Sequence, residues 1–199
     1  MTFDDLPLAA ALKDSLRARK LVQPTPVQRD AIPPALQSKD VLACAQTGSG
    51  KTAAFVLPIL QRLIEDPGAA PERAMRNLVL VPTRELAVQV AEVFGQLGAS
   101  EGIMVQCVYG GVSQRRQVHG LSAGPEVVVA TPGRLLDLMA QRYVDLSQVE
   151  CLVLDEVDRM LDMGFVRDVR KIVAALPAKR QNLAFSATLA PGVENILAQ

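Results

Sequence analysis

The sequence has no excess of charge of either sign, because its 21 Lys and Arg residues are matched by 21 Asp and Glu residues. Such a chain has no global positive field to attract nucleic acid, so any nucleic-acid contact must depend on local features. A hydrophobic share of 49% and a charged share of 21% over 199 residues are those of an ordinary globular chain. They exclude extensive disorder and indicate one domain, or one and a half at most.

Cysteine and histidine are scarce. Three cysteines occur, Cys44, Cys107 and Cys151, and they lie in apolar runs without the spacing of a metal site. This odd number argues against a disulfide framework and a zinc site, and it favours a reducing, cytoplasmic location. The one histidine, His119, lies in the polar stretch SQRRQVHG and is expected at the surface with the two neighbouring arginines.

Long hydrophobic runs are absent as well. No apolar run approaches the ~20 residues that a membrane helix needs. At the N-terminus, acidic residues precede a short apolar stretch that Lys13 interrupts, which is unlike a signal peptide. We therefore expect neither a membrane span nor a secretory leader.

Apolar, β-branched runs alternate with helix-like segments along the chain. Most of the runs, such as LVLV, VVVA and CLVLD, are continuously apolar, as strands buried on both faces of a parallel sheet are. This alternation predicts right-handed βαβ units and therefore an α/β fold, with a mostly parallel, doubly wound sheet and helices on both faces. The predicted strands are 40–45, 77–81, 103–109, 126–130, 151–155 and 182–186, and the predicted helices are 7–19, 26–37, 51–65, 84–97, 133–141 and 165–176.

The first two helical segments precede every predicted strand. They predict a helical region at 1–38 that packs on a core domain at 39–199, and Pro26 suits the first position of the second helix. The stretch DPGAAPERAMR at 66–76 has the Pro, Gly and Ala content of an exposed loop.

The strongest motif, AQTGSGKT at 45–52, follows the first predicted strand and opens the next helix. Its glycines let the backbone wrap closely, so that N–H groups and the helix N-terminus face phosphate oxygens. The lysine would reach the β and γ phosphates, and the threonine hydroxyl would ligate Mg²⁺. This context favours a phosphate loop over a chance turn, although Ala45 replaces the first glycine of the general pattern. The predicted phosphate-binding residues are Gln46, Thr47, Gly48, Ser49, Gly50, Lys51 and Thr52.

Two adjacent carboxylates, Asp155 and Glu156, end the predicted strand CLVL. Open α/β sheets bind their ligands at the carboxyl ends of strands. We expect Asp155 to hold Mg²⁺ through water, and Glu156 to orient and deprotonate an attacking water, with Lys51 as the third catalytic residue. The alternative is that both acids only cap the following helix, but the phosphate loop upstream favours the metal and base roles.

Taken together, these motifs resemble the first RecA-like domain of a DEAD-box RNA helicase, in the family's order and nearly from end to end. Phe3 together with PTPVQ at 24–28 resembles the Q motif, and AQTGSGKT resembles motif I. PTRELA at 82–87 resembles motif Ia, and TPGR at 131–134 resembles motif Ib. The doublet at 110–111, DEVD at 155–158 and SAT at 186–188 match the family's GG doublet and its motifs II and III. RMLDMGF and LPAKRQNLAFSAT are similar to the bacterial RhlE-like branch.

The resemblance implies ATP and Mg²⁺ as cofactors and RNA as the partner. Adenine would be bound by Phe3, Thr25 and Gln28, because an amide that both donates and accepts matches the N6 and N7 edge of adenine. On sequence alone, Gln28 would instead be a solvent-facing residue of an amphipathic helix.

RNA phosphates would lie against helix N-termini and backbone N–H groups at the carboxyl ends of strands. Arginines there would fork onto phosphate oxygens, and the glycine doublet would permit close approach. The alternative makes both arginines ordinary first-turn residues with surface ion pairs. The implied RNA-binding residues are Pro82, Thr83, Arg84, Gly110, Gly111, Thr131, Pro132, Gly133 and Arg134.

Asp158, Ser186 and Thr188 would link the ATP site to the RNA side, unless the two hydroxyls only cap a turn. Two positions depart from the family pattern. Val157 replaces the usual alanine of motif II and is expected to need more room behind the phosphate loop. Lys20-Leu21 stands where the Q motif has glycine and an aromatic, so that adenine stacking would depend on Phe3.

The predicted function is that of the ATP-binding domain of an ATP-dependent RNA helicase, an ATP hydrolase that couples Mg·ATP to RNA duplex remodelling. One alternative is an ATP-dependent RNA-binding switch without efficient turnover, which would not need Glu156 as a base. A DNA-translocating motor fits PTRELA, TPGR and the Q motif less well. Nothing after motif III resembles the family's second RecA-like domain with its arginine finger. The isolated chain is therefore expected to bind ATP and RNA weakly and to hydrolyse almost no ATP.

Overall fold

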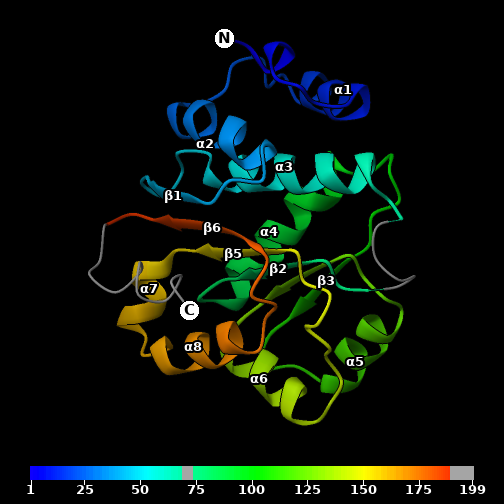
Figure 1. The fold of residues 1–199 in the computed structure, drawn as a ribbon, viewed down its shortest axis with the longest axis vertical. Helices are drawn as coiled ribbons and strands as arrows, with labels where there is room; N and C mark the ends of the chain where they lie inside the picture. Colours follow the sequence, from blue (N-terminus) through cyan, green and yellow to red (C-terminus); the bar gives the residue numbers. More distant parts are fainter. Residues whose placement is uncertain (69–73, 189–199) are drawn as a thin grey trace.

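A single parallel sheet organises the computed structural model, which describes residues 1–68 and 74–188 (Figure 1). The strand order is β1-β6-β5-β2-β4-β3, and every neighbouring pair is parallel. The predicted α/β class is therefore confirmed. The strands are β1 (Val41–Cys44), β2 (Asn77–Leu80), β3 (Val105–Val108), β4 (Val127–Ala130), β5 (Cys151–Asp155) and β6 (Gln181–Ser186).

The apolar character of each strand follows its place in the sheet. The four inner strands β6, β5, β2 and β4 are buried along their whole length. The two edge strands β1 and β3 keep half-buried positions, and in β1 these alternate with exposed ones. Continuous apolar runs thus mark inner strands, which are covered on both faces.

Helices cover both faces of the sheet (Figure 1). The predicted bounds of α3 and α4 are correct, and the other predicted helices differ by one to three residues at their ends. One face carries α2 (Pro26–Leu36), α3 (Lys51–Glu65) and α4 (Arg84–Leu97), with the 3₁₀ helix η1 (Phe3–Asp5) and α1 (Ala10–Ala18) outside them. The other face carries α6 (Pro132–Ala140), α7 (Val157–Asp162) and α8 (Val166–Ala174), with α5 (Gln114–Ser122) beside β3.

Each face of the sheet has its own hydrophobic cluster. In the first, Leu12 and Leu16 of α1 share one cluster with Phe55 of α3 and Phe94 of α4, so the N-terminal helices lie directly on the core. Burying side chains of this size contributes about 1.5–3 kcal/mol each. The rings of Phe55 and Phe185 lie 5.4 Å apart and join α3 to β6.

Val157 belongs to the second cluster, with Leu154 and Val169, and is 1% exposed. The expectation that it needs room behind the phosphate loop is wrong. The loop leads into α3 on the first face, whereas Val157 packs on the opposite face of the sheet.

The predicted loop at 66–76 is only partly described, because 69–73 lie outside the described residues. The prediction of an exposed loop is wrong for its last two residues, which are buried. Met75 is 8% exposed, and Arg76 is 3% exposed with its Nε 2.8 Å from the Glu150 carboxylate. His119, Arg115 and Arg116 are exposed, as predicted. No helix within 1–68 and 74–188 is both long enough and apolar enough to cross a membrane.

Candidate nucleotide and RNA site

The carboxyl ends of all six described strands meet at one edge of the sheet, and almost every predicted site residue follows one of them. The strand order divides this edge into two halves. The loops after β1, β5 and β6 carry motifs I, II and III, and these strands are neighbours. The loops after β2, β3 and β4 carry the predicted RNA-binding residues, and these strands also lie side by side.

The phosphate loop has the backbone that a close wrap requires. Gly48 and Gly50 adopt left-handed φ angles of +83° and +92°, which residues other than glycine rarely adopt. A Cβ at Gly50 would also lie 2.5 Å from Nε2 of Gln28. Ala45, the departure from the general pattern, still pairs with β6 through its N–H to the carbonyl of Ser186 at 2.8 Å. The loop therefore turns after Ala45, where no glycine is needed.

Two buried polar atoms of this loop lack partners among the described residues. Lys51 is 6% exposed, and its Nζ has no hydrogen-bond partner within the described part of the chain. The same holds for the hydroxyl of Ser49. A buried ammonium or hydroxyl without a partner is costly, and phosphate oxygens are strong acceptors for such donors. The cradle therefore fits the phosphates of a nucleotide.

Asp155 ends β5 and is 2% exposed. Burial raises the pKa of this carboxyl to about 6, although the nearby charge of Lys51 opposes the rise. Thr52, in the first turn of α3, offers a hydroxyl oxygen on the same half of the edge. Carboxylate and hydroxyl oxygens suit Mg²⁺, which takes its other ligands from water and substrate phosphates. Accordingly, no group of three or more His, Cys, Asp or Glu in the described residues could hold a metal by itself.

Glu156 lies at a strained turn between β5 and α7. Its φ and ψ of 52° and 51° are left-handed, a conformation that non-glycine residues adopt at a cost and that clusters at functional sites. Its N–H donates to Oδ1 of Asp155 at 2.9 Å, and its carboxylate accepts from Arg159 at 3.1 Å. Sequence reasoning missed Arg159, although its spacing of three residues from Glu156 on a short helix predicts an ion pair.

Motif III is bonded directly to motif II. Oδ2 of Asp158 accepts from the N–H of Ala187 at 3.1 Å and from the N–H and hydroxyl of Thr188 at 3.0 and 3.1 Å. The N–H of Asp158 donates to the Ser186 hydroxyl at 3.3 Å. Partial burial raises the pKa of Asp158, but these and neighbouring hydrogen bonds outweigh it and the net pKa is lowered. The carboxylate is therefore held charged between the ends of β5 and β6.

Gln28 joins the first turn of α2 to the phosphate loop. It is 7% exposed, so the solvent-facing alternative is wrong. Its Nε2 donates to the carbonyl of Gly50 at 3.0 Å, and its Oε1 accepts the N–H of Thr25 at 2.9 Å. Both polar ends of the amide thus already have partners in the chain without nucleotide.

Phe3 is 4% exposed and packs in the first hydrophobic cluster, while its N–H donates to the carbonyl of Val22 at 3.1 Å. Its role in stacking on adenine stays a prediction. Lys20 has a left-handed φ of 58°, which explains why the family pattern places glycine there. Leu21 is 43% exposed.

The predicted RNA-binding residues begin two helices and one loop. Thr83 caps α4 by accepting the N–H of Leu86 at 3.3 Å. Arg84 is exposed, and its guanidinium lies 5.1 Å from the centre of the Tyr109 ring, a contact that no local sequence pattern predicts. Pro82 is buried before this turn.

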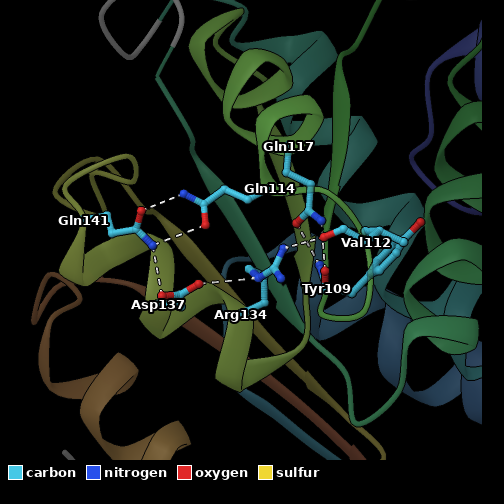
Figure 2. Close-up of polar contacts among 7 residues, drawn as sticks. All are labelled: Tyr109, Val112, Gln114, Gln117, Arg134, Asp137 and Gln141. Carbon is cyan, nitrogen blue, oxygen red and sulfur yellow. Dashed lines mark hydrogen bonds and ion pairs between the residues drawn. The ribbon is translucent and has the colours of Figure 1, made fainter.

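The glycine doublet and TPGR lie beside each other. Gly110 and Gly111 are exposed, and a Cβ at either would meet no atom of the described residues within 4 Å. Arg134 donates to the carbonyl of Val112 at 3.3 Å, and its Nε lies 3.6 Å from Asp137 (Figure 2). The rest of TPGR starts α6, with Thr131 at the N-cap, Pro132 first in the helix and Gly133 exposed after it.

Residues 25–196 match the family described as DEAD/DEAH box helicase. The chain belongs to this family. It is 44% identical to the DEAD-box ATP-dependent RNA helicase CshA of Streptococcus pneumoniae over 98% of this chain and 36% of that protein. It is 48% identical to the probable ATP-dependent RNA helicase DDX49 of Mus musculus over 94% of this chain and 39% of that protein. The chain thus spans less than half the length of these DEAD-box relatives.

Solved structures of the family share the fold. A DEAD box protein from the hyperthermophile Methanococcus jannaschii superposes with a TM-score of 0.91 at 34% identity, over 100% of this chain and 53% of that one. A hypothetical ATP-dependent RNA helicase from Sulfolobus tokodaii gives 0.85 at 37% identity, over 96% and 54%. The RecA-like DEAD-box domain that the sequence predicted is confirmed, while the RhlE-like branch stays a prediction.

Proposed function

We propose that the chain is the ATP-binding domain of an ATP-dependent RNA helicase, in which one sheet edge binds Mg·ATP on one half and an RNA backbone on the other. The observation that supports this most is Lys51. Its buried ammonium, which has no partner in the part of the chain that the structure describes, lies at the start of α3, on the same half of the edge as Asp155. Charged phosphate oxygens are the partners that such a group requires.

On the nucleotide half, the N–H groups of the phosphate loop and Lys51 would hold the β and γ phosphates. Thr52 and Asp155 would hold Mg²⁺, which neutralises phosphate charge when bound. Glu156 would accept the proton of the attacking water, because its carboxylate follows Asp155 directly and is 13% exposed. Gln28 would select adenine, because its bonds to Gly50 and Thr25 leave one N–H and one lone pair of the amide for the N6 and N7 edge.

On the RNA half, Arg84, Arg134 and the backbone at the glycine doublet would contact phosphates. Such contacts fix the path of a strand without reading its bases, so binding would be sensitive to salt and indifferent to sequence. A second RecA-like domain of the same protein would supply the arginine finger and the other half of the RNA site. A cytoplasmic location would suit this role.

The test is ATP turnover by a protein in which residues 1–199 are joined to a second RecA-like domain, measured as phosphate release with and without RNA. RNA-stimulated release with preference for ATP over GTP is expected. Binding of ATP and RNA without stimulated release would support the switch instead. In a strand-displacement assay, the isolated chain should separate no duplex, and efficient separation would contradict its role as one half of a two-domain enzyme.

A further inference from the structure

Gln117 is a buried glutamine of α5 whose two polar atoms both bind the same residue. Its Oε1 accepts the N–H of Tyr109 at 3.0 Å, and its Nε2 donates to the carbonyl of Tyr109 at 2.9 Å (Figure 2). We refer to these two hydrogen bonds as the Tyr109 clamp. A neighbouring antiparallel strand would make the same pair of bonds, donating one and accepting one from a single residue. The side-chain amide takes the place of such a strand, so the clamp fixes the backbone at Tyr109, one residue beyond the end of β3.

Three predicted RNA contacts converge on the clamped residue. Gly110 and Gly111 follow it directly, and the Arg84 guanidinium lies 5.1 Å from the centre of its ring. The glycines have no side chains, and space for a Cβ is open at both. Packing therefore does not hold their path, and the position of the doublet depends on how its two ends are fastened.

The other end of the doublet is fastened less firmly. Arg134 donates to the carbonyl of Val112 at 3.3 Å, and Asp137 lies 3.6 Å from the same guanidinium. Gln114 and Gln141 join α5 to α6 through a 2.6 Å hydrogen bond (Figure 2). Because Arg134 is itself a predicted phosphate contact, its bond to Val112 competes with RNA, whereas the Tyr109 clamp does not.

We propose that Gln117 is a positioning residue for RNA binding, an inference that rests on the proposed function. Gln117 is 5% exposed and would not touch RNA itself. It acts through Tyr109, by holding the glycine doublet and the stacked Arg84 as one preformed surface for a sugar–phosphate backbone. Without the clamp, this backbone would have to be ordered when RNA binds, which weakens binding.

The test replaces Gln117 by methionine, which keeps the length of the side chain and removes both hydrogen bonds. Gln181→Met is the matched control. Gln181 is also 5% exposed and lies at the start of β6, away from the carboxyl edge. Its amide donates to the carbonyls of Ala35 and Lys39 at 2.9 and 2.7 Å and accepts from the Arg62 guanidinium. The 199-residue chain is titrated onto a fluorescein-labelled oligouridylate at low salt, and thermal unfolding and affinity for a non-hydrolysable ATP analogue are measured in parallel.

We expect Gln117→Met to weaken RNA binding about 10-fold, as the ordering of about one backbone residue predicts. Both variants should lower thermal stability by similar amounts, because each loses buried hydrogen bonds. Gln181→Met should nevertheless leave RNA affinity within about 2-fold, and neither variant should change affinity for the ATP analogue. Faster hydrogen exchange at the Tyr109 amide in Gln117→Met would show that the clamp has opened.

Gln117→Asn provides a second variant in case the methionine variant does not fold. It keeps a neutral amide that is one methylene shorter, so the two bonds to Tyr109 are lengthened or lost in part, and an intermediate loss of roughly 3-fold is expected. RNA affinity equal to that of the unmodified chain in the folded variants would overturn the inference alone. Absence of RNA binding by the unmodified chain would overturn the proposed function and this inference together.

Discussion

The two halves of the sheet edge differ in whether their polar side chains already have partners within the chain. On the nucleotide half, buried polar atoms of Lys51 and Ser49 lack partners among residues 1–68 and 74–188, and Glu156 lies in a strained conformation. On the RNA half, Arg84, Arg134 and Gln117 each have a partner within the chain. The first half is therefore completed by its ligand, whereas the second is already ordered and presents a fixed surface. Binding energy on the nucleotide half should be large and sensitive to single side chains, and on the RNA half it should be spread over many contacts.

The largest effect should come from Glu156→Gln in a protein that includes the second RecA-like domain. Glutamine keeps the shape of the side chain but cannot accept a proton, so ATP should still bind while hydrolysis falls by ~10² to 10⁴-fold. Single-turnover phosphate release measures the loss. Near-normal turnover would mean that the base lies elsewhere and that the strained turn serves another purpose.

Asp155→Asn should stabilise the chain in the absence of nucleotide and metal, which would demonstrate the cost stored on this half. Burial raises the pKa of Asp155 from 3.8 to about 6, so the folded state binds its proton more tightly than the unfolded state does. The free energy of unfolding therefore falls as pH rises from 4 to 6, by up to about 3 kcal/mol. The asparagine variant lacks this loss, so its advantage in denaturant unfolding should grow between pH 4 and pH 7. An advantage that is constant with pH would contradict the buried-charge explanation.

Lys51→Ala should separate the two halves functionally. Loss of a charged hydrogen bond to phosphate should weaken ATP binding about 10- to 100-fold. The variant should remain folded, because Nζ of Lys51 makes no hydrogen bond to the described residues that the substitution would remove. RNA affinity measured without nucleotide should stay unchanged, and a parallel loss there would show that the halves do not act separately.

The smallest effect should come from Gly110→Ala. Gly110 has no left-handed φ, and its Cβ would meet no described atom within 4 Å, so the added methyl group causes no strain in the free chain. If a sugar–phosphate backbone lies close to this residue, RNA affinity should fall about 10-fold or less. Thermal stability and ATP binding serve as controls and should not change. Unaltered RNA affinity would place the strand farther from the doublet.

Local features of the structure could be predicted from the sequence, and long-range ones could not. The bounds of α3 and α4 are correct because a phosphate loop and a capping threonine mark their starts. The strand order is not encoded by any local pattern, because each apolar run could pair with any other. The side on which Val157 packs depends on that order, and this explains the wrong expectation for it.

The burial of polar side chains could not be predicted from the sequence either. Gln117 lies in SQRRQVHG, where composition alone indicates a solvated helix face. Its spacing of four residues from Leu121, which packs near the second cluster, is the one signal that could have placed it on the buried face. Gln28 was placed at the nucleotide site only through the family resemblance, since nothing in its neighbourhood distinguishes a buried amide from an exposed one, and its selection of adenine stays a prediction.

The order of strands also sets how two polyanions bound as proposed at this edge would affect each other. Four strand spacings separate β1, which precedes the phosphate loop, from β4, which precedes TPGR. At about 4.8 Å each, these spacings amount to about 19 Å, roughly twice the screening length at physiological ionic strength. ATP and RNA bound at these places would therefore hardly repel each other through solvent. Any influence between these two places must then be transmitted mechanically, through the sheet and the hydrogen bonds at its edge, and it should persist when salt is raised.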